Sequence, residues 1–213
     1  MLMSATVITY HRAMGRWEPD ARGRLAKAAM ALYAEQGFDQ TTVAEIAARA
    51  GLTERTFFRH FADKREVLFY GTDMARDLLT RAVADAPASA TPAEAVGAAL
   101  QAFGALLQEN PERVRLRDAI VSAHPELRER ELIKLAALAA AITGALRDRG
   151  VPEPAASLAA EAGIAVFKVA FARWIGEPGQ PDLPGILRES MKELRGVLID
   201  PAGRLSCEPA GTT

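Results

Sequence analysis

Residues 41–68 read TTVAEIAARAGLTERTFFRHFADKREVL, and this stretch predicts two short helices joined by a tight turn. Val43, Ile46 and Ala50 recur at helical spacing, so one face of the first helix is apolar. Gly51 follows at the point where that helix must end in a left-handed conformation, which a residue with a Cβ atom resists. The stretch therefore predicts a helix-turn-helix corner.

Threonines mark the starts of both helices. Thr41 or Thr42 can cap the first helix, and Glu45 follows Thr42 at the distance of a capping box. Thr53 can cap the second helix in the same way. These signals predict helices over 43–50 and 54–60.

The second helix has an apolar side and a polar side. Phe57 and Phe61, four residues apart, form the apolar side. The residues left to face outward are Glu54, Arg55, Thr56, Phe58, Arg59 and His60. A helix of about two turns with this outer side fits the major groove of DNA. Similar corners also occur in helical proteins that bind no DNA, but the caps, the glycine turn and the cationic side together favour DNA binding.

The stretch resembles the DNA-binding domain of TetR-like transcriptional regulators. The positions that match the family pattern are Thr42-Val43, Ile46-Ala47, Ala50-Gly51, Thr56, Phe58, His60-Phe61 and Lys64. The preceding helix matches at Leu25, Ala28, Ala29, Leu32, Tyr33 and Gly37-Phe38, so the resemblance covers 22–68. Phe58 stands where the family commonly has tyrosine, so a hydroxyl contact to phosphate is missing.

The side chains of the second helix predict a division between base and phosphate contacts. Arg55 can bind guanine in bidentate fashion, Glu54 can accept from cytosine, and Thr56 can touch a thymine methyl group. Phosphate contacts are expected from Thr42, Arg59, His60 and Lys64. The full expected DNA-binding set is Thr42, Val43, Ala44, Thr53, Glu54, Arg55, Thr56, Phe58, Arg59, His60 and Lys64.

Composition is that of an ordinary globular protein. The chain has 213 residues, of which 49% are hydrophobic and 25% charged, and alanine and leucine dominate over aromatic residues, which favours helices. No run of 18 or more uncharged apolar residues predicts a membrane span, and the N-terminus lacks a secretory signal. The single Cys207 excludes an intrachain disulfide framework. We expect a cytoplasmic protein.

The net charge of −1 does not indicate whether the protein binds DNA, because the cations that matter gather locally on the predicted DNA-reading helix.

Residues that start and end helices recur along the chain and predict an all-α protein in two domains. We expect a disordered arm at 1–17, a helix-turn-helix DNA-binding domain with its connecting helix at 18–84, a helical effector-binding and dimerisation domain at 91–199, and a disordered tail at 200–213. Helices are expected at 20–36, 64–84, 91–109, 110–122, 125–149, 155–175 and 183–199. The segment 85–92, DAPASATP, is the expected linker between the domains. Translation is expected to start at Met14, with a real N-terminal arm that reaches the minor groove as the alternative.

The expected helix over 155–175 is apolar almost all round. Between 155 and 172 only Glu161 and Lys168 are charged, so this helix must be buried on more than one side. Small residues such as Ala162 and Ala165 permit close approach of another helix. The alternative is the central core helix of a monomer. The family resemblance implies a homodimer formed through the last two helices.

A candidate effector site lies between the helices of the second domain. Its expected residues are Phe103, Leu107, Arg117, Ile120, Phe167, Phe171 and Trp174. Bulky side chains among many alanines can leave a cavity, and one of Arg113, Arg115 and Arg117 could face inward to meet a polar group of the ligand. The alternative is ordinary core with solvated arginines. The resemblance implies a small, often hydrophobic effector, and the 103–120 segment resembles the acyl-CoA-responsive branch only faintly.

Two other classes of function are weighed against a regulator. The sequence has no glycine-rich phosphate loop, no G-x-S-x-G or H-E-x-x-H motif and no cysteine–histidine cluster, so neither an enzyme nor a cofactor or metal site is expected. The alternative is a helical small-molecule-binding module without a DNA-binding role. The expected partners are a palindromic double-stranded DNA operator, a small-molecule effector and a second copy of the chain, with no membrane.

Overall fold

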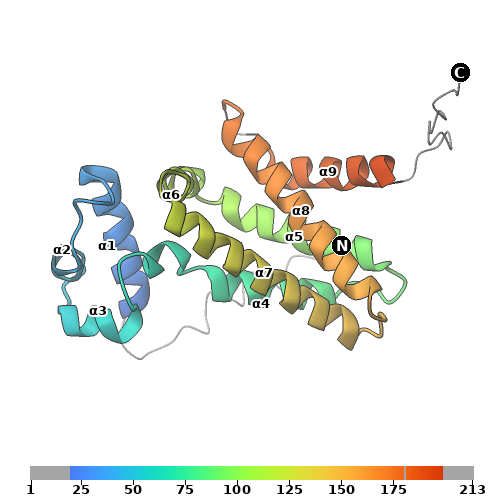
Figure 1. The fold of residues 1–213 in the computed structure, drawn as a ribbon, viewed down its shortest axis with the longest axis horizontal. Helices are drawn as coiled ribbons and strands as arrows, with labels where there is room; N and C mark the ends of the chain where they lie inside the picture. The colour runs from blue at the N-terminus through green and yellow to red at the C-terminus, as the bar shows by residue number, and fades with distance from the viewer. Residues whose placement is uncertain (1–19, 180, 199–213) are drawn as a thin grey trace, which may run out of the picture. The chain divides into compact units, whose positions relative to one another are not determined.

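The computed structural model describes residues 20–179 and 181–198, and the chain divides into two compact units, Met1–Tyr70 and Gly71–Thr213. Every regular element in these described residues is a helix, which confirms the predicted all-α class (Figure 1). The expected arm at 1–17, the start at Met14, Cys207 and the tail at 200–213 lie outside the described residues.

In the first unit, residues 20–70 form three α-helices and a short 3-10 helix. These are α1 (Ala21–Gln36), α2 (Val43–Arg49), α3 (Glu54–His60) and η1 (Glu66–Phe69). Asp20 caps α1 by accepting a hydrogen bond from the Gly23 amide at 2.9 Å. The core that holds these helices together is formed by Leu25, Ala29, Leu32, Tyr33, Ile46, Ala47, Phe57, Phe61 and Val67, all of them buried.

The described residues of the second unit form a bundle of six helices. They are α4 (Thr72–Ala84), α5 (Pro92–Gln108), α6 (Pro111–Ala123), α7 (Pro125–Asp148), α8 (Ala155–Gly176) and α9 (Leu183–Leu198). Helix α5 is central because it packs against α4, α8 and α9. Gly163 lets α8 approach α5 closely, since a Cβ atom there would overlap a methyl group of Val96. The observed bounds of these helices, α4 excepted, agree with the predicted ones to within two residues.

The predicted helix over 64–84 and the domain boundary at 84 are both corrected. Asp63 accepts hydrogen bonds from the amides of Arg65 and Glu66, at 2.8 and 3.0 Å, and so starts the short η1 turn rather than a long helix. Val67, Leu68 and Phe69 are all buried, and three consecutive residues cannot share one face of an α-helix. A separate helix, α4, begins at Thr72 and packs on α5 and α7 in the second unit.

The expected interdomain linker at 85–92 is a loop inside the second unit. It joins α4 to α5, and both helices belong to the same core. The guanidinium of Arg149, just after α7, donates to the carbonyl oxygens of Ala84, Ala86 and Pro87 at 3.0, 2.6 and 2.8 Å. This contact holds the loop against the end of α7 and completes the C-terminus of α4.

Helix α8 is apolar over most of its length. Among the described residues it is the helix whose length and composition would allow it to cross a membrane, a test that the core helix of a soluble protein also passes. It carries Glu161, Lys168 and Arg173. Its buried side, which includes Ala160 and Gly163, packs within the bundle.

Candidate nucleic-acid interface and effector site

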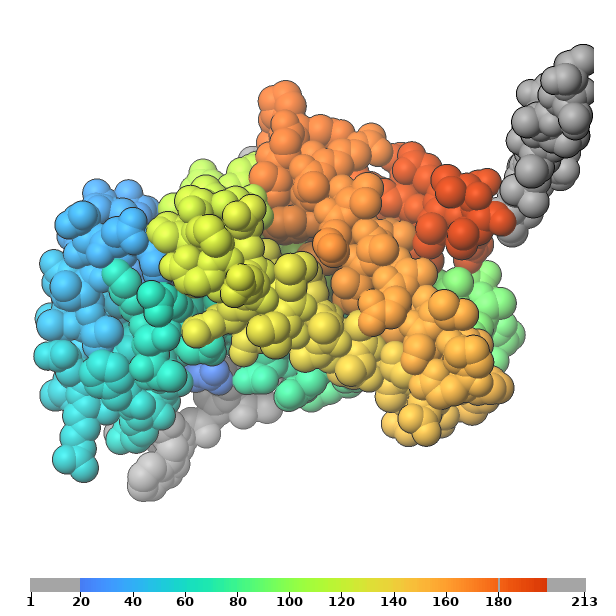
Figure 2. Space-filling view, in the orientation of Figure 1, coloured from blue at the N-terminus to red at the C-terminus, as the bar shows by residue number. Residues whose placement is uncertain are grey.

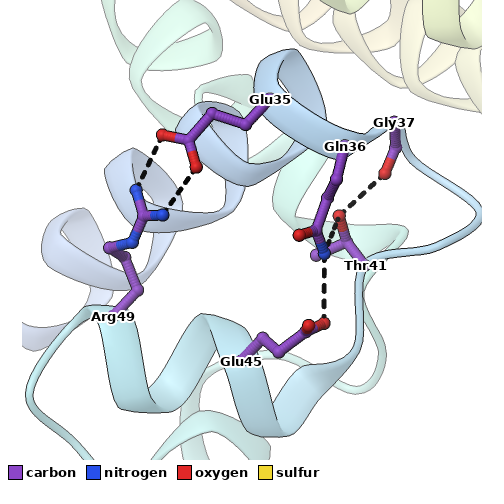
Figure 3. Close-up of polar contacts among 6 residues, drawn as sticks. All are labelled: Glu35, Gln36, Gly37, Thr41, Glu45 and Arg49. Atoms are coloured by element: carbon purple, nitrogen blue, oxygen red, sulfur yellow. Dashed lines mark hydrogen bonds and ion pairs between the residues drawn. The ribbon is translucent and has the colours of Figure 1, made fainter.

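The start of α2 is fixed by a complete capping box. The Thr42 amide and hydroxyl both donate to Glu45 Oε2 at 2.8 Å, and the Glu45 amide donates to Thr42 Oγ1 at 3.2 Å. These bonds lower the pKa of Glu45, because they stabilise its charged form. Of the two predicted caps, Thr42 is the one used. Thr41 is buried and donates to the Gly37 carbonyl at 2.7 Å (Figure 3).

An ion pair fixes α2 against α1. The Arg49 guanidinium donates two hydrogen bonds to the Glu35 carboxylate, at 2.9 and 2.6 Å, in the fork geometry drawn in Figure 3. Arg49 thereby lowers the pKa of Glu35. Gln36 adds a second link, donating to Glu45 at 3.2 Å. The sequence alone does not predict these contacts, because no spacing rule relates residues 14 positions apart in two different helices.

The turn between α2 and α3 follows the prediction. Gly51 has a φ of 67°, in the left-handed region that favours glycine. The Leu52 amide then donates to the Ala47 carbonyl at 2.8 Å and closes the turn. Thr53 caps α3 by accepting from the Thr56 amide at 3.2 Å, and the two threonine hydroxyls lie 3.1 Å apart. Both helix starts are therefore set by side chains close in sequence.

Helix α3 is anchored by phenylalanine and presents charge to solvent. Phe57 is fully buried and Phe61 nearly so, with ring centroids 5.5 Å apart. Glu54, Arg55 and Arg59 are exposed, and among the described residues none of these three makes a hydrogen bond or an ion pair. The outer side of α3 therefore carries charges that no other side chain in the described chain compensates.

The other predicted contacts lie beside this charged side. Phe58 is 55% exposed on α3. Thr42 and Ala44 are exposed and Val43 is half-buried at the start of α2. His60 is half-buried, and its Nε2 is buried without a hydrogen-bond partner among the described residues, so that nitrogen cannot reach a phosphate in this conformation.

Lys64 has a different environment from the one predicted. Its ammonium group donates to the carbonyl oxygens of Phe38, Asp39 and Thr41 at 2.8, 3.0 and 2.8 Å, and it lies 4.7 Å from the centre of the Phe38 ring. An ammonium group has three donors, and all three are used inside the chain. The expected phosphate contact of Lys64 is therefore corrected to a contact that holds the α1–α2 loop.

A buried tyrosine completes this arrangement. The Tyr33 hydroxyl donates to the backbone carbonyl of Lys64 at 2.7 Å, and burial, followed by the nearby Asp63 carboxylate, raises the pKa of Tyr33. We call Lys64, its three carbonyl acceptors and Tyr33 the Lys64 clamp. It joins the segment after α3 to α1 and to the loop before α2. The sequence contains the lysine, but nothing in its spacing shows which way the long side chain turns.

In the second unit, four of the predicted effector residues form a row of rings. Phe103 of α5 lies 5.3 Å from Phe167 of α8, Phe167 lies 5.5 Å from Phe171, and Phe171 lies 5.9 Å from Trp174, between ring centroids. Trp174 is buried and donates from its indole nitrogen to the Pro181 carbonyl at 3.0 Å. The other three rings are half-buried, so one edge of the row is accessible.

The three arginines of α6 have different partners. Arg117, the predicted inward residue, forms a short ion pair with Glu131 of α7. Arg115 instead lies over the Trp174 ring, 5.2 Å from its centre, and Arg113 is exposed. The arginine beside the row of rings is therefore Arg115, whereas Arg117 is paired with Glu131. Because α6 advances 100° per residue, the sequence could not choose between them.

The remaining expected residues and an unexpected groove lie elsewhere in the second unit. Leu107 packs half-buried against the core, and Ile120 is buried. A shallow open groove of about 400 Å³ lies between α4 and α7, lined by Thr80, Arg81, Ala84, Ala145, Asp148 and Arg149. It shares no residue with the predicted effector site, and nothing in the sequence indicated it.

A capped helix-turn-helix with a charged outer helix, followed by a separate helical bundle, defines a DNA-binding regulator. Residues 25–70 match the family model described as bacterial regulatory proteins, tetR family, and residues 90–198 match the model of the MftR C-terminal domain. The chain therefore belongs to the tetR family of bacterial regulatory proteins. This confirms the predicted family, and it agrees with the expectation that the protein is a transcriptional regulator rather than an enzyme.

Individual relatives agree with this assignment. The chain is 36% identical over 81 residues to the HTH-type transcriptional regulator TcmR of Streptomyces glaucescens, a match that covers 38% of this chain and 36% of that protein. The fold is similar to FadR of Thermus thermophilus, crystallised with lauroyl-CoA, at 24% identity and a TM-score of 0.55, covering 89% of this chain and 100% of that one. It is also similar to SmeT in a complex with triclosan, at 23% identity and a TM-score of 0.61, covering 92% and 100%.

Proposed function

We propose that the protein is a ligand-responsive transcriptional repressor that binds a palindromic operator as a homodimer in the cytoplasm. One observation carries the DNA-binding part: Glu54, Arg55 and Arg59 are exposed and unpaired on a helix whose other side is fixed by buried phenylalanine. Such a helix can enter the major groove without first breaking contacts of its own. Membership of the tetR family supports the same conclusion.

Within this interface, base and phosphate contacts are divided between residues. Arg55, at the start of α3, is proposed to read guanine, Glu54 cytosine and Thr56 a thymine methyl group. Thr42, Val43, Ala44 and Thr53, at the two helix starts, are proposed to lie against the DNA backbone together with Arg59. Lys64 is not among the proposed DNA contacts, because the three N–H donors of its ammonium group are used in the Lys64 clamp.

The test is operator binding by fluorescence anisotropy with the DNA upstream of the protein's own gene. Arg55→Ala should cost about 1–3 kcal/mol and relax specificity at one base pair of each half-site. Arg59→Ala should weaken binding to all sequences alike and reduce the salt dependence. If both variants lost the same affinity on every operator variant, the division of roles would be wrong. If the wild-type protein did not distinguish operator from random DNA, the alternative of a small-molecule-binding module would be favoured.

For the effector, we propose a small hydrophobic molecule at the accessible edge of the ring row. Phe103, Phe167 and Phe171 offer half-buried aromatic surface, and Arg115 beside Trp174 offers a cation for a polar end of the ligand. FadR and SmeT, which have this fold, were solved with lauroyl-CoA and with triclosan. A screen by tryptophan fluorescence can follow Trp174 alone once Trp17 is replaced by phenylalanine, because the chain has two tryptophans.

Repression would be relieved through coupling between the two sites. The free energy required is typically about 1–3 kcal/mol, and linkage demands that operator DNA weaken ligand binding by the same factor. A ligand that bound tightly but left operator affinity unchanged would not be the effector. The dimer is proposed to form through the last two helices, α8 and α9, because one helix of about two turns reads few bases and a second copy doubles the site.

A further inference from the structure

The outer side of α8 carries an uncharged seam exposed to solvent. Leu158 is 67% exposed and Val169 is 63% exposed, although both are large and apolar. Ala165 and Ala172 are also exposed, and Ala162 is half-buried. We call these five residues the α8 seam. The opposite side of the same helix is already occupied within the bundle, so the seam is a second apolar face.

The seam has the spacing of a coiled coil. Its members follow one another at alternating steps of four and three residues, an average of about 3.5, which keeps an apolar stripe facing a partner helix along its whole length. Three of the five are alanine, which lets two helix backbones approach closely. At about 1.5 Å per residue the seam is about 21 Å long.

The seam is self-complementary about its central residue. If a second α8 runs antiparallel with the twofold axis beside Ala165, Leu158 faces the partner's Ala172, and Val169 faces the partner's Ala162. Each large side chain then meets a small one. A parallel arrangement in register would instead place Leu158 on Leu158 and Val169 on Val169, with gaps between the alanines.

The two charges that flank the seam obey the same symmetry. Glu161 and Lys168 lie four residues before and three residues after Ala165, on one edge of the seam. Both are exposed, and in the described part of the chain neither has an ion pair or hydrogen bond. In the antiparallel arrangement Glu161 of each copy meets the partner's Lys168, which makes two equivalent ion pairs. In a parallel arrangement the charged edges of the two copies would lie on opposite sides of the contact, so these ion pairs could not form.

We propose that α8 packs against its own copy in this antiparallel register, with Ala165 on the twofold axis and reciprocal Glu161–Lys168 pairs. The proposal rests on the proposed dimer and deepens it, by naming the residues that set the register. The occupant of the seam is a second copy of this chain. The seam of one copy complements the seam of the other, because large side chains face small ones and each Glu161 faces a Lys168.

A charge swap tests the register. Glu161→Lys and Lys168→Glu should each weaken the dimer by about 10- to 100-fold in analytical ultracentrifugation, because each places like charges opposite one another. The double variant should return the dissociation constant to near the wild-type value. Both positions are exposed, so the helix content and melting temperature of the monomer serve as a folding control. If the double variant were as weak as the single ones, or if the single ones had no effect, this register would be wrong.

Cysteine cross-linking gives an independent measurement. In a Cys207→Ser background, Ala165→Cys should form an interchain disulfide under mild oxidation, since a disulfide needs Cβ atoms about 3.5–4.5 Å apart. Ala155→Cys is the matched control, because it is also an exposed alanine of α8 but would lie about 30 Å from its own copy. A dimer in which Ala165→Cys did not cross-link would overturn the register and leave the proposed dimer intact. A wild-type chain that stayed monomeric at all concentrations would overturn both.

Discussion

Replacing Lys64 by methionine should separate its role in the fold from a role in DNA binding. Methionine keeps most of the apolar stem and removes the ammonium group. The three carbonyl oxygens of Phe38, Asp39 and Thr41 would then lose their common donor, which now lies 2.8–3.0 Å from each. We expect the loss to appear as a less stable DNA-binding unit.

The magnitude follows from the kind of bond lost. A hydrogen bond to a charged group contributes about 1.5–3 kcal/mol when it is well shielded, but the three bonds here are partly buried or exposed, so water can replace part of the interaction. We therefore expect a total loss of about 2–4 kcal/mol. For a unit of this size, each 1 kcal/mol lowers the melting temperature by about 4–8 °C.

Two assays distinguish the roles. Thermal unfolding measures stability, and operator affinity as a function of salt counts phosphate contacts, since each contact contributes about 0.9 to the slope of log K against log salt. Lys64→Met should unfold at lower temperature and, measured where it is folded, keep the wild-type slope. Arg59→Met is the matched control, and should keep stability and lose about 0.9 of slope per head. A Lys64→Met protein of normal stability with a reduced slope would refute the clamp.

Three further perturbations follow from the structure. Phe58→Tyr should restore the phosphate contact common in the family and raise operator affinity a few-fold for every operator variant, as measured by anisotropy; an unchanged affinity would contradict it. Gly163→Ala should destabilise the second unit by about 1–3 kcal/mol in chemical denaturation, with partial rescue by Val96→Ala, whereas Gly144→Ala, which meets nothing within 4 Å, should stabilise by up to about 1 kcal/mol. Burial, followed by the charge of Glu131, raises the pKa of Asp118, so the folded state holds that proton more tightly than the unfolded chain. Stability contributed by this group is present at pH values below the ordinary aspartate pKa of about 3.9, and it is lost as the pH rises through the raised pKa of the folded state. Asp118→Asn should remove that decline in denaturation curves measured at each pH.

The sequence predicted most accurately the features that depend on residues close together in the chain. The capping box of Thr42 and Glu45, the left-handed Gly51 and the buried pair Phe57 and Phe61 involve partners no more than four residues apart. Their geometry follows from helix periodicity alone. Helices α5 and α6 of the second unit were placed for the same reason, because threonine or asparagine followed by proline stands at their starts.

The contacts of long charged side chains could not be predicted in this way. Lys64 reaches carbonyls 23–26 residues away, and Arg117 pairs with Glu131 on another helix. The same flexible side chain can bind a ligand or form a contact within the protein. Which of the two it does depends on the acceptors that the fold brings within its reach. The predicted phosphate contact of Lys64 and the predicted ligand contact of Arg117 therefore compete with contacts inside the chain, whereas among the described residues no hydrogen bond or ion pair competes for Arg55.

The start of α4 at Thr72 could not be predicted, for a related reason. The segment after α3 has apolar residues at helical spacing, and a continuous helix satisfies that pattern. The structure divides it because Val67 and its two neighbours are buried in the first unit, whereas Leu79 and Val83 are buried in the second. One straight helix cannot serve two separate cores, and periodicity carries no information about which core a residue joins.

Helix α8 joins the two proposed activities of the second unit. The ring-bearing residue Phe167 and the seam residue Val169 are two positions apart, which places them about 200° apart around the helix, on nearly opposite sides. In the proposed dimer, a ligand that displaced the rings would act on the same helix whose outer side contacts the second copy. The short α3 needs two correctly spaced heads to read an operator, so we propose that a rotation of α8 releases the operator by changing that spacing. On this basis an effector needs no contact with the DNA-binding unit to release the operator.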